Sequence, residues 1–325
     1  MVRLVPDTTR TLITLDDIRA AAVRIRGVAL RTPLLEIGSL ALKCENLQPM
    51  GAFKVRGACN MIAQLPPERR AAGVITYSSG NHGQAVALVA QRFGIPAVVV
   101  MPETTPAIKV EGVRRYGAEV IFAGTTTLHR KARAEQELSA RGLTMVPPFD
   151  DPWVIAGQGT VGLEILEQCP GVATVFVPAG GGGLISGVSA AIKGMRGGVR
   201  IVGVEPDGAA KMSRSREAGH PVTLDHVSSI ADGLLAVRPG DLTFEHVQTL
   251  VDDVVTVSDD QIRSAVRWLF REASLVAEPS GAAAVAGALA HAQPERGMSV
   301  AIVSGGNVDP AAYATYISPV PPSAS

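Results

Sequence analysis

The sequence predicts an α/β protein with two open, mostly parallel, twisted sheets that carry helices on both faces. The first observation is that short apolar strands alternate with longer amphipathic helices from Val74 onward, as in repeated βα units. The second is that strands such as Ala97–Met101 are apolar without interruption, as expected for strands buried on both faces. The third is size, because 325 residues with 46% hydrophobic content suffice for about two domains.

The chain begins with a predicted helix whose start is marked by Thr14. The Thr14 hydroxyl can cap the helix, and Asp16 and Asp17 favour its positive end. Its apolar face consists of Ile18, Ala22 and Ile25. A short apolar strand, Leu40–Cys44, is expected next.

A compact parallel unit follows, with four strands and three helices. The expected strands are Val74–Tyr77, Ala97–Met101, Glu119–Phe122 and Thr144–Val146. The expected helices are Asn81–Phe93 closed by Gly94, one opened by Pro106 and ended by Gly117, and Thr127–Arg141 closed by Gly142. We therefore expect residues 74–148 to form a small domain, and residues 1–73 together with 149–325 to form a large one.

The second half of the chain repeats this alternation. The expected strands are Thr174–Val177, Ile201–Glu205, Asp253–Val257 and Ser299–Val303. The expected helices are Val154–Gln168, Leu184–Ile192, Asp259–Arg271 and Gly281–Ala290. Ligands of open α/β sheets bind beyond the carboxyl ends of the strands, so the residues directly after each strand are the functional candidates.

Composition excludes several classes of protein. Thirty basic and thirty acidic residues give a net charge of zero, so no global field attracts nucleic acid or an anionic membrane. The three cysteines have no metal-binding spacing. No apolar leader precedes Asp7, and no apolar run is long enough to span a membrane. We expect a cytoplasmic, enzyme-sized protein.

A glycine-rich loop stands between a strand and a helix. Gly180, Gly181, Gly182 and Gly183 follow Val177 and precede Leu184. Their amides can converge at the positive end of the helix, which suits a phosphate, although a tight turn without a ligand is the plainer interpretation. The Walker and dinucleotide patterns both fail here. A nicotinamide site stays open as a weaker alternative, because Glu205 stands where a ribose-binding acid would lie.

Two further polar glycine turns follow strands. Ser78-Ser79-Gly80-Asn81-His82-Gly83-Gln84 comes after Tyr77, and Ser304-Gly305-Gly306-Asn307 comes after Val303. The first suits a carboxylate, because hydroxyls and backbone amides can converge on it. Taken singly, the first is equally an ordinary helix cap, and the second is more often just a loop.

Lys54 stands at an expected helix start between Phe53 and Val55. Such a lysine is ordinarily solvated with an apolar stem. A cation at this end of a helix is disfavoured by the dipole, however, and desolvation would lower its pKa further. A lysine with a lowered pKa is what Schiff-base chemistry requires.

The ordered set of motifs resembles one enzyme family. Gly51-Ala-Phe-Lys54-Val-Arg-Gly-Ala58, the Ser78 turn, the glycine loop and the Ser304 turn occur together in this order. The set is similar to the fold-type II pyridoxal-phosphate enzymes, in the serine/threonine dehydratase and serine racemase branch (the tryptophan synthase β-like fold). The similarity runs from Thr14 to Asp309, and it includes Ile155–Thr160, Ile230–Gly233 and Ala277–Gly281.

The resemblance implies roles for these residues. The large domain would bind pyridoxal 5′-phosphate, with Lys54 as its Schiff-base lysine and Phe53 packed beside it. Asn81 would contact the ring oxygen, Ser304 the pyridine nitrogen, and Gly180 to Gly183 with Leu184 the phosphate. The small domain would bind the substrate through Ser78, Ser79, Asn81, His82 and Arg130. Ser79 would be the second acid–base group of a racemase, and Arg130 is either a solvated side chain or a clamp for a β-carboxylate.

Three departures from the family pattern matter. Ala52 occupies a position that is often serine. Lys211 stands where members with a divalent-cation site have a second acid after Glu205, so we expect its ammonium to neutralise Glu205 and we expect no metal. The chain to residue 325 carries no regulatory domain of the biosynthetic threonine deaminases, so isoleucine feedback is not expected.

The resemblance implies a pyridoxal-phosphate ammonia-lyase that converts a β-hydroxy amino acid, such as L-threonine, L-serine or 3-hydroxyaspartate, to a keto acid and ammonia. A homodimer is implied as well. An amino-acid racemase is the alternative within the cofactor class. A nicotinamide-dependent oxidoreductase and a non-catalytic binding module are the alternatives outside it.

Overall fold

The computed structural model describes residues 12–78, 80–125 and 127–318. The elements up to residue 145 are α1 (Leu15–Arg24), β1 (Leu34–Ile37), β2 (Leu40–Lys43), η1 (Glu45–Leu47), α2 (Lys54–Ala63), α3 (Pro67–Ala72), β3 (Val74–Tyr77), α4 (Asn81–Phe93), β4 (Ala97–Met101), α5 (Ala107–Arg114), β5 (Glu119–Phe122), α6 (Thr127–Arg141) and β6 (Thr144–Met145).

The remaining elements return to the larger part of the molecule. They are α7 (Pro152–Gln168), β7 (Val172–Pro178), α8 (Gly183–Met195), β8 (Arg200–Pro206), η2 (Asp207–Ala209), α9 (Lys211–Ala218), η3 (Asp232–Leu234), α10 (Asp241–Leu250), β9 (Asp253–Val257), α11 (Asp259–Ala273), α12 (Pro279–His291), η4 (Pro294–Arg296), β10 (Met298–Ile302) and α13 (Pro310–Ile317).

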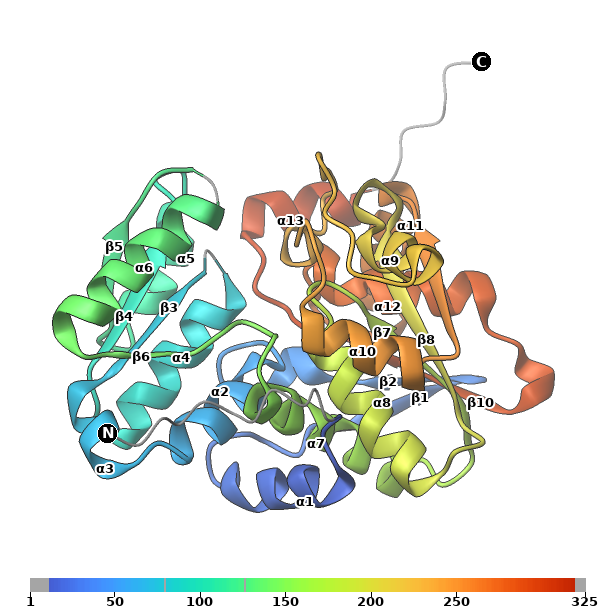
Figure 1. Cartoon of the computed structure of the whole chain (residues 1–325). Coiled ribbons are helices and arrows are strands. Elements are labelled where there is room, and N and C mark those ends of the chain that lie inside the picture. The colour runs from blue at the N-terminus through green and yellow to red at the C-terminus, as the bar shows by residue number, and fades with distance from the viewer. Residues whose placement is uncertain (1–11, 79, 126, 319–325) are drawn as a thin grey trace.

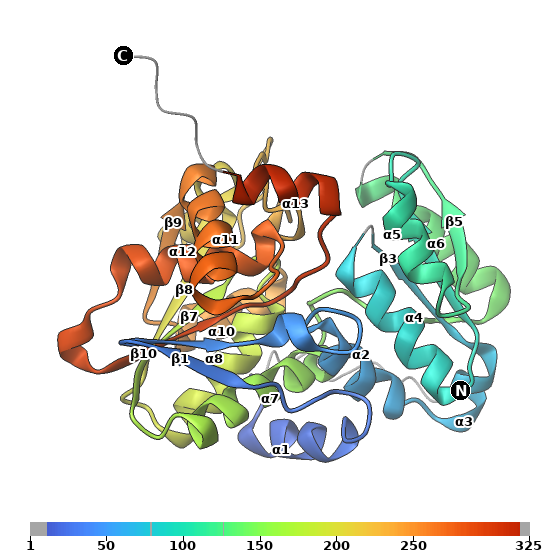
Figure 2. The same ribbon diagram turned by 180° about the vertical axis from the view of Figure 1, so that it is seen from behind.

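Two open sheets organise these elements. The larger sheet has the strand order β1-β2-β10-β7-β8-β9, and the smaller has the order β5-β4-β3-β6. Every pairing is parallel except β1 with β2. The predicted fold class is therefore confirmed. Figures 1 and 2 show the smaller sheet and its helices as one half of the molecule, with α2 between it and the larger half.

The larger sheet is buried on both faces. Alternate side chains of one strand enter different cores: Leu42 packs with α11 and α12, whereas its neighbour Ala41 packs with α7, α8 and α10. Phe176 and Val175 of β7 divide in the same way. This two-sided burial explains the uninterrupted apolar strands.

The smaller sheet has the same construction. Val99 faces a core that includes α4 and α2, while Val98 faces α6 on the other side. All four of its strands lie between residues 74 and 145, inside the expected small domain, whose boundaries remain a prediction.

Several elements differ from the sequence expectations. The antiparallel strand β1 was not expected, nor were the short helices α3, α9, α10 and α13. The helix expected from Val154 begins at Pro152, because the Asp151 carboxylate caps the amides of Trp153 and Val154. Within the described ranges, no helix combines the length and apolar character needed to cross a membrane.

Candidate active site

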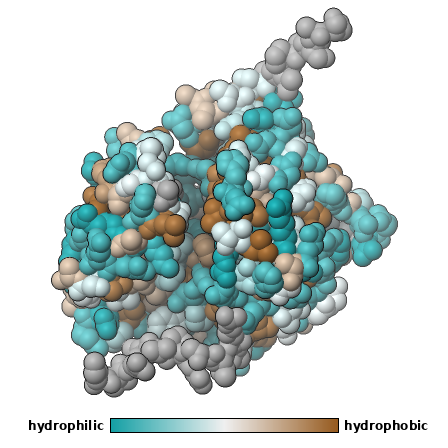
Figure 3. All heavy atoms as spheres, turned by 45° about the horizontal axis from the view of Figure 1, so that its top comes forward, coloured by the Kyte–Doolittle hydropathy of each residue, from teal (hydrophilic) through white to brown (hydrophobic). Residues whose placement is uncertain are grey.

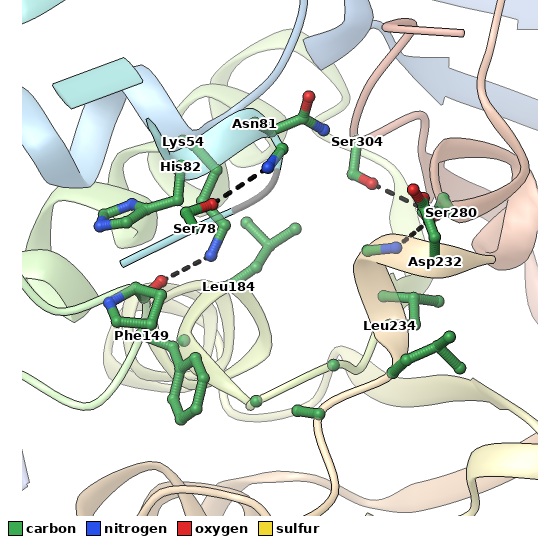
Figure 4. A pocket seen from close by; sticks show the side chains of 18 of the residues that line it. Lys54, Ser78, Asn81, His82, Phe149, Leu184, Asp232, Leu234, Ser280 and Ser304 are labelled. Carbon is green, nitrogen blue, oxygen red and sulfur yellow. Dashed lines mark hydrogen bonds between the residues drawn. The ribbon is translucent and has the colours of Figure 1, made fainter. Parts of the chain in front are cut away.

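A pocket of about 330 Å³ lies between the two halves, at the carboxyl ends of the central strands. Figure 3 shows hydrophilic and hydrophobic side chains bordering the hollow between the halves, and Figure 4 shows the interior. The lining includes nearly every site residue that the sequence predicts, namely Phe53, Lys54, Ser78, Asn81, His82, Arg130, Gly180, Gly181, Gly182, Gly183, Leu184 and Ser304. Ser79 lies outside the described residues.

Lys54 is the first residue of α2, and its amine lies in this pocket (Figure 4). The Nζ atom donates a hydrogen bond of 2.5 Å to the carbonyl oxygen of Pro148 and lies 5.1 Å from the centre of the Phe53 ring. Burial lowers the pKa of Lys54 to about 8. The neutral, nucleophilic amine is therefore accessible near physiological pH.

The glycine loop connects β7 to α8 and lines the same pocket as Lys54. Gly182 has a φ of +100° and caps α8, a conformation that glycine adopts without strain. A Cβ on Gly181 would lie 2.3 Å from the Phe149 ring, so only glycine fits there. This glycine cradle lies at the start of α8, and the positive end of a helix suits an anion such as a phosphate group.

Asn81 connects the other two polar turns. Its amide nitrogen donates to Glu278 Oε1 at 2.5 Å, and its amide oxygen accepts from Asn307 Nδ2 at 2.7 Å. The Ser304 hydroxyl lies 3.4 Å from the Ser280 carbonyl oxygen, which accepts from it. The Ser304 carbonyl accepts from the Phe53 amide at 3.1 Å, so this turn is bonded directly to the start of the Lys54 helix.

His82 is buried on the small-sheet side of the pocket. Its Nε2 atom donates to the Val146 carbonyl at 2.9 Å, which makes Nδ1 the unprotonated nitrogen. Burial, reinforced by the charge of Lys54, lowers the pKa of His82 to about 3. His82 is therefore neutral, and the buried Nδ1 atom has no hydrogen-bond partner among the described residues.

Arg130 is half-buried on α6 and lines the same pocket. One terminal nitrogen donates to Thr127 Oγ1 at 2.7 Å. Its buried Nε atom has no hydrogen-bond partner within the described part of the chain. Arg130 therefore lies at the pocket, and its role as a clamp stays a prediction.

Several residues that line the pocket were not predicted from the sequence as site residues. Pro148 and Phe149 come from the segment after β6, and Leu234 comes from η3. Lys109 of α5 and Asp232 of η3 form an ion pair between the halves. Glu278, inside a stretch that the resemblance quoted, is buried against Asn81; burial, with the nearby Asp232 charge, raises its pKa to about 8.

The Lys211 ammonium lies 3.3 Å from Glu205 Oε2, and both side chains are fully buried. The expected neutralisation of Glu205 is therefore present. Among the described residues, no group of three or more histidine, cysteine and acidic side chains is placed to hold a metal ion.

A lysine facing a glycine-lined anion cradle between two parallel sheets defines a cofactor-dependent α/β enzyme. Residues 25–305 match the family model described as "Pyridoxal-phosphate dependent enzyme". The chain belongs to this family, and pyridoxal phosphate is its cofactor. The glycine cradle at Gly181 and the half-buried Lys54 amine fit that group.

The relatives divide between two activities. The chain is 45% identical to an L-threonine ammonia-lyase from Thermotoga maritima over 92% of this chain and 76% of that protein. It is 42% identical to a serine racemase from Oryza sativa subsp. indica, covering 90% of both proteins. The structure of maize serine racemase superposes with a TM-score of 0.90 at 40% identity, covering 94% of this chain and 97% of that one. Identity alone therefore does not separate a dehydratase from a racemase.

Proposed function

We propose that this protein is a pyridoxal-phosphate-dependent ammonia-lyase of β-hydroxy amino acids. The net reaction removes the α-proton and the β-hydroxyl as water, and hydrolysis of the resulting enamine gives a keto acid and ammonia. The observation that carries the proposal is the half-buried Lys54 amine, whose pKa is lowered to about 8 and which lines the same pocket as the glycine loop.

When bound, the cofactor withdraws electrons from the substrate α-carbon and acidifies its proton. We assign Lys54 to hold the cofactor and then to take the α-proton as general base. A primary amine with a pKa near the working pH is suited to that transfer. Gly180 to Gly183 with Leu184 would hold the phosphate, Phe53 would pack beside the ring, and Asn81 would bond to the ring oxygen.

Ser304 supports elimination over slower chemistry. Its hydroxyl, bonded to the Ser280 carbonyl, is assigned to the pyridine nitrogen. A hydroxyl stabilises a protonated pyridine less well than a carboxylate would, so negative charge at the α-carbon is stabilised less and prompt loss of the β-hydroxyl is favoured.

The small half is assigned to the substrate. The Ser78 hydroxyl, the Asn81 amide and the backbone at His82 would bind the α-carboxylate, because all three line the pocket wall formed by the start of α4. This division of labour corresponds to a substrate-binding domain of residues 74–148 and a cofactor-binding domain formed by the rest. A homodimer is the assembly that we expect.

Replacement of Lys54 by alanine tests the assignment. We expect Lys54→Ala to lose keto-acid formation from L-threonine and L-serine by at least about 10³-fold. Borohydride reduction of the wild type followed by peptide mapping should place the label on Lys54. Lys109→Ala is the matched control, because Lys109 lines the same pocket and should leave the labelled peptide unchanged. Normal turnover by Lys54→Ala, or a label elsewhere, contradicts the proposal.

A racemase is the second candidate, since the relatives include serine racemases at similar identity. Its second acid–base group would be Ser79. Chiral analysis of serine after incubation distinguishes the two reactions, because a dehydratase depletes L-serine as pyruvate accumulates. Accumulation of D-serine at a comparable rate would favour the racemase, and its loss in Ser79→Ala would identify the second group.

We propose that Arg130 determines which substrate side chain the enzyme prefers. Its side chain lines the pocket, and its buried Nε atom has no hydrogen-bond partner among the described residues. A substrate with a β-carboxylate, such as 3-hydroxyaspartate, would gain a charge-assisted hydrogen bond to this guanidinium. We expect Arg130→Ala to lower kcat/KM about tenfold or more on 3-hydroxyaspartate and far less on threonine. Equal losses on the two substrates would remove the clamp.

A further inference from the structure

A buried cage of oxygen atoms surrounds the Lys211 ammonium beside the glycine loop. Lys211 Nζ donates to the carbonyl oxygens of Ala179 at 2.8 Å, Leu234 at 3.0 Å and Ala209 at 3.1 Å. The Glu205 carboxylate lies 3.3 Å away and supplies the opposite charge. Three donors of one ammonium thus meet three carbonyls, which satisfies the hydrogen-bonding capacity of the group.

The cage is also closed from the carboxylate side. The two Glu205 oxygens accept from the backbone amides of Met212 at 3.0 Å and Ser213 at 2.8 Å, at the start of α9. Divalent cations in proteins require several oxygen ligands around a free centre. Here the centre is occupied by a tethered cation, and Glu205 is the only acid facing it among the described contacts of Lys211. These residues do not fit a divalent-cation site.

The segments held by the cage border the cofactor pocket. Ala179 directly precedes Gly180 of the glycine loop, and Leu234 lies in η3, which also lines the pocket. Glu205 lies in β8, and Ala209 lies in η2 on the connection from β8 to α9. One side chain therefore joins three separate segments at the position where the cradle is formed.

We propose that the Lys211 ammonium is a built-in cation that holds the glycine loop in its phosphate-binding conformation and makes a divalent cation unnecessary. Lys211 is a positioning residue, because it contacts the backbone of Ala179 directly before the loop and does not line the pocket. The inference rests on the proposed placement of the phosphate at Gly180 to Gly183. It is independent of whether the chemistry is elimination or racemisation.

Lys43 shows that a buried lysine need not serve this purpose. Its side chain is as buried as that of Lys211, and it bonds to Glu164, Gln168 and the Thr32 carbonyl. None of these partners lines the pocket. Lys43→Met is therefore the matched control for the loss of one buried ammonium.

The test compares the affinities of the apoprotein for pyridoxal 5′-phosphate and for pyridoxal, which lacks the phosphate. We expect Lys211→Met to raise the Kd for pyridoxal phosphate about tenfold or more, while the Kd for pyridoxal changes far less. Lys211→Gln, which keeps donors to the carbonyls without the charge, provides the measurement if the Met variant does not fold. Lys43→Met should retain both affinities. Gly181→Ala, whose Cβ would clash with Phe149, should weaken pyridoxal phosphate selectively if the phosphate lies at this loop.

Each outcome decides the proposal. Unchanged affinity in a folded Lys211 variant, or an equal loss for both ligands, overturns it, as does the same selective loss in Lys43→Met. A wild type whose cofactor affinity falls on exhaustive chelation and returns with Mg²⁺ also overturns it. Failure of Gly181→Ala to distinguish the two ligands would instead locate the error in the phosphate placement. Keto-acid release does not enter this measurement, so an error in the proposed reaction leaves the result unaffected.

Discussion

Lys54 and Arg56 lie two residues apart in the first turn of α2, yet their surroundings are opposite. Two residues advance about 200° around a helix, so Lys54 faces the pocket while Arg56 faces the interior. The Arg56 guanidinium is fully buried and bonds to both oxygens of Glu45 and both of Glu164. Lys54 bonds to the neutral carbonyl of Pro148.

The difference shows that two cations at the start of one helix can have different roles, one structural and one chemical. The carboxylates of Glu45 and Glu164 keep Arg56 charged although burial alone would favour its neutral form. Burial without such a partner instead lowers the pKa of Lys54 to about 8. A paired cation stabilises the native state, whereas an unpaired one is left available as a nucleophile and base.

Removal of the paired cation should have the largest effect on stability. Arg56→Met would leave the fully buried Glu45 carboxylate without its main partner, so we expect a loss of about 3–5 kcal/mol in the free energy of unfolding of the apoprotein. Urea denaturation at pH 7 measures it.

Lys54→Met is the matched variant for this comparison. It removes an ammonium that burial already disfavours, so the apoprotein should lose less than about 1 kcal/mol or become more stable. Similar losses in the two variants would show that the division between a structural and a reactive cation is wrong.

The titration of Lys54 sharpens the comparison. The rate at which the apoprotein condenses with pyridoxal phosphate depends on the neutral amine, so it should rise about tenfold per pH unit below pH 8 and level off above it. The amine of an N-acetyl-lysine amide standard, with a pKa of about 10.4, should continue to accelerate through pH 9.5.

The stability of the apoprotein changes with pH in a direction set by the same shift. Because the folded-state pKa of Lys54 lies below its unfolded value, the folded state binds fewer protons in the interval between them. Lys54 therefore adds stability as the pH rises above about 8 toward its unfolded value. A condensation rate that follows the standard beyond pH 9 would refute the lowered pKa.

Three predicted parts of the site share one property, which is that they directly follow a strand. The Ser78 turn, the glycine loop and the Ser304 turn all lie at carboxyl ends of parallel strands, and the structure brings them into one pocket. Lys54 was predictable from its place at a helix start. The alternation of strands and helices was likewise sufficient for the two parallel sheets.

The parts that were missed depend on distant chain segments. Glu278 reaches Asn81 across 197 residues of sequence, and the Phe149 ring fits Gly181 only because the chain returns from β6 past the loop. The pocket wall formed by residues 232–238 comes after a stretch without hydrophobic periodicity. No local sequence pattern therefore predicts its position. Strand β1 is short and antiparallel at a sheet edge, where the alternation rule does not apply.

Glu278 is the acidic counterpart of Lys54 in the pocket, and its titration gives a further test of the comparison. Burial and the nearby Asp232 raise its pKa to about 8, although the Asn81 hydrogen bond and Lys109 oppose the shift. The folded state therefore binds more protons than the unfolded state between the unfolded value and pH 8. The contribution of Glu278 to stability is complete at low pH and is lost as the pH rises through about 8, with a slope of at most about 1.4 kcal/mol per pH unit. Glu278→Gln keeps an oxygen to accept from Asn81 but cannot titrate, so its stability relative to the wild type should increase from pH 5 to pH 8. A difference in stability between the two proteins that stays constant from pH 5 to pH 8 would show that Glu278 is already ionised at pH 5. The pocket would then hold a second charged group without a counterion, besides Lys54.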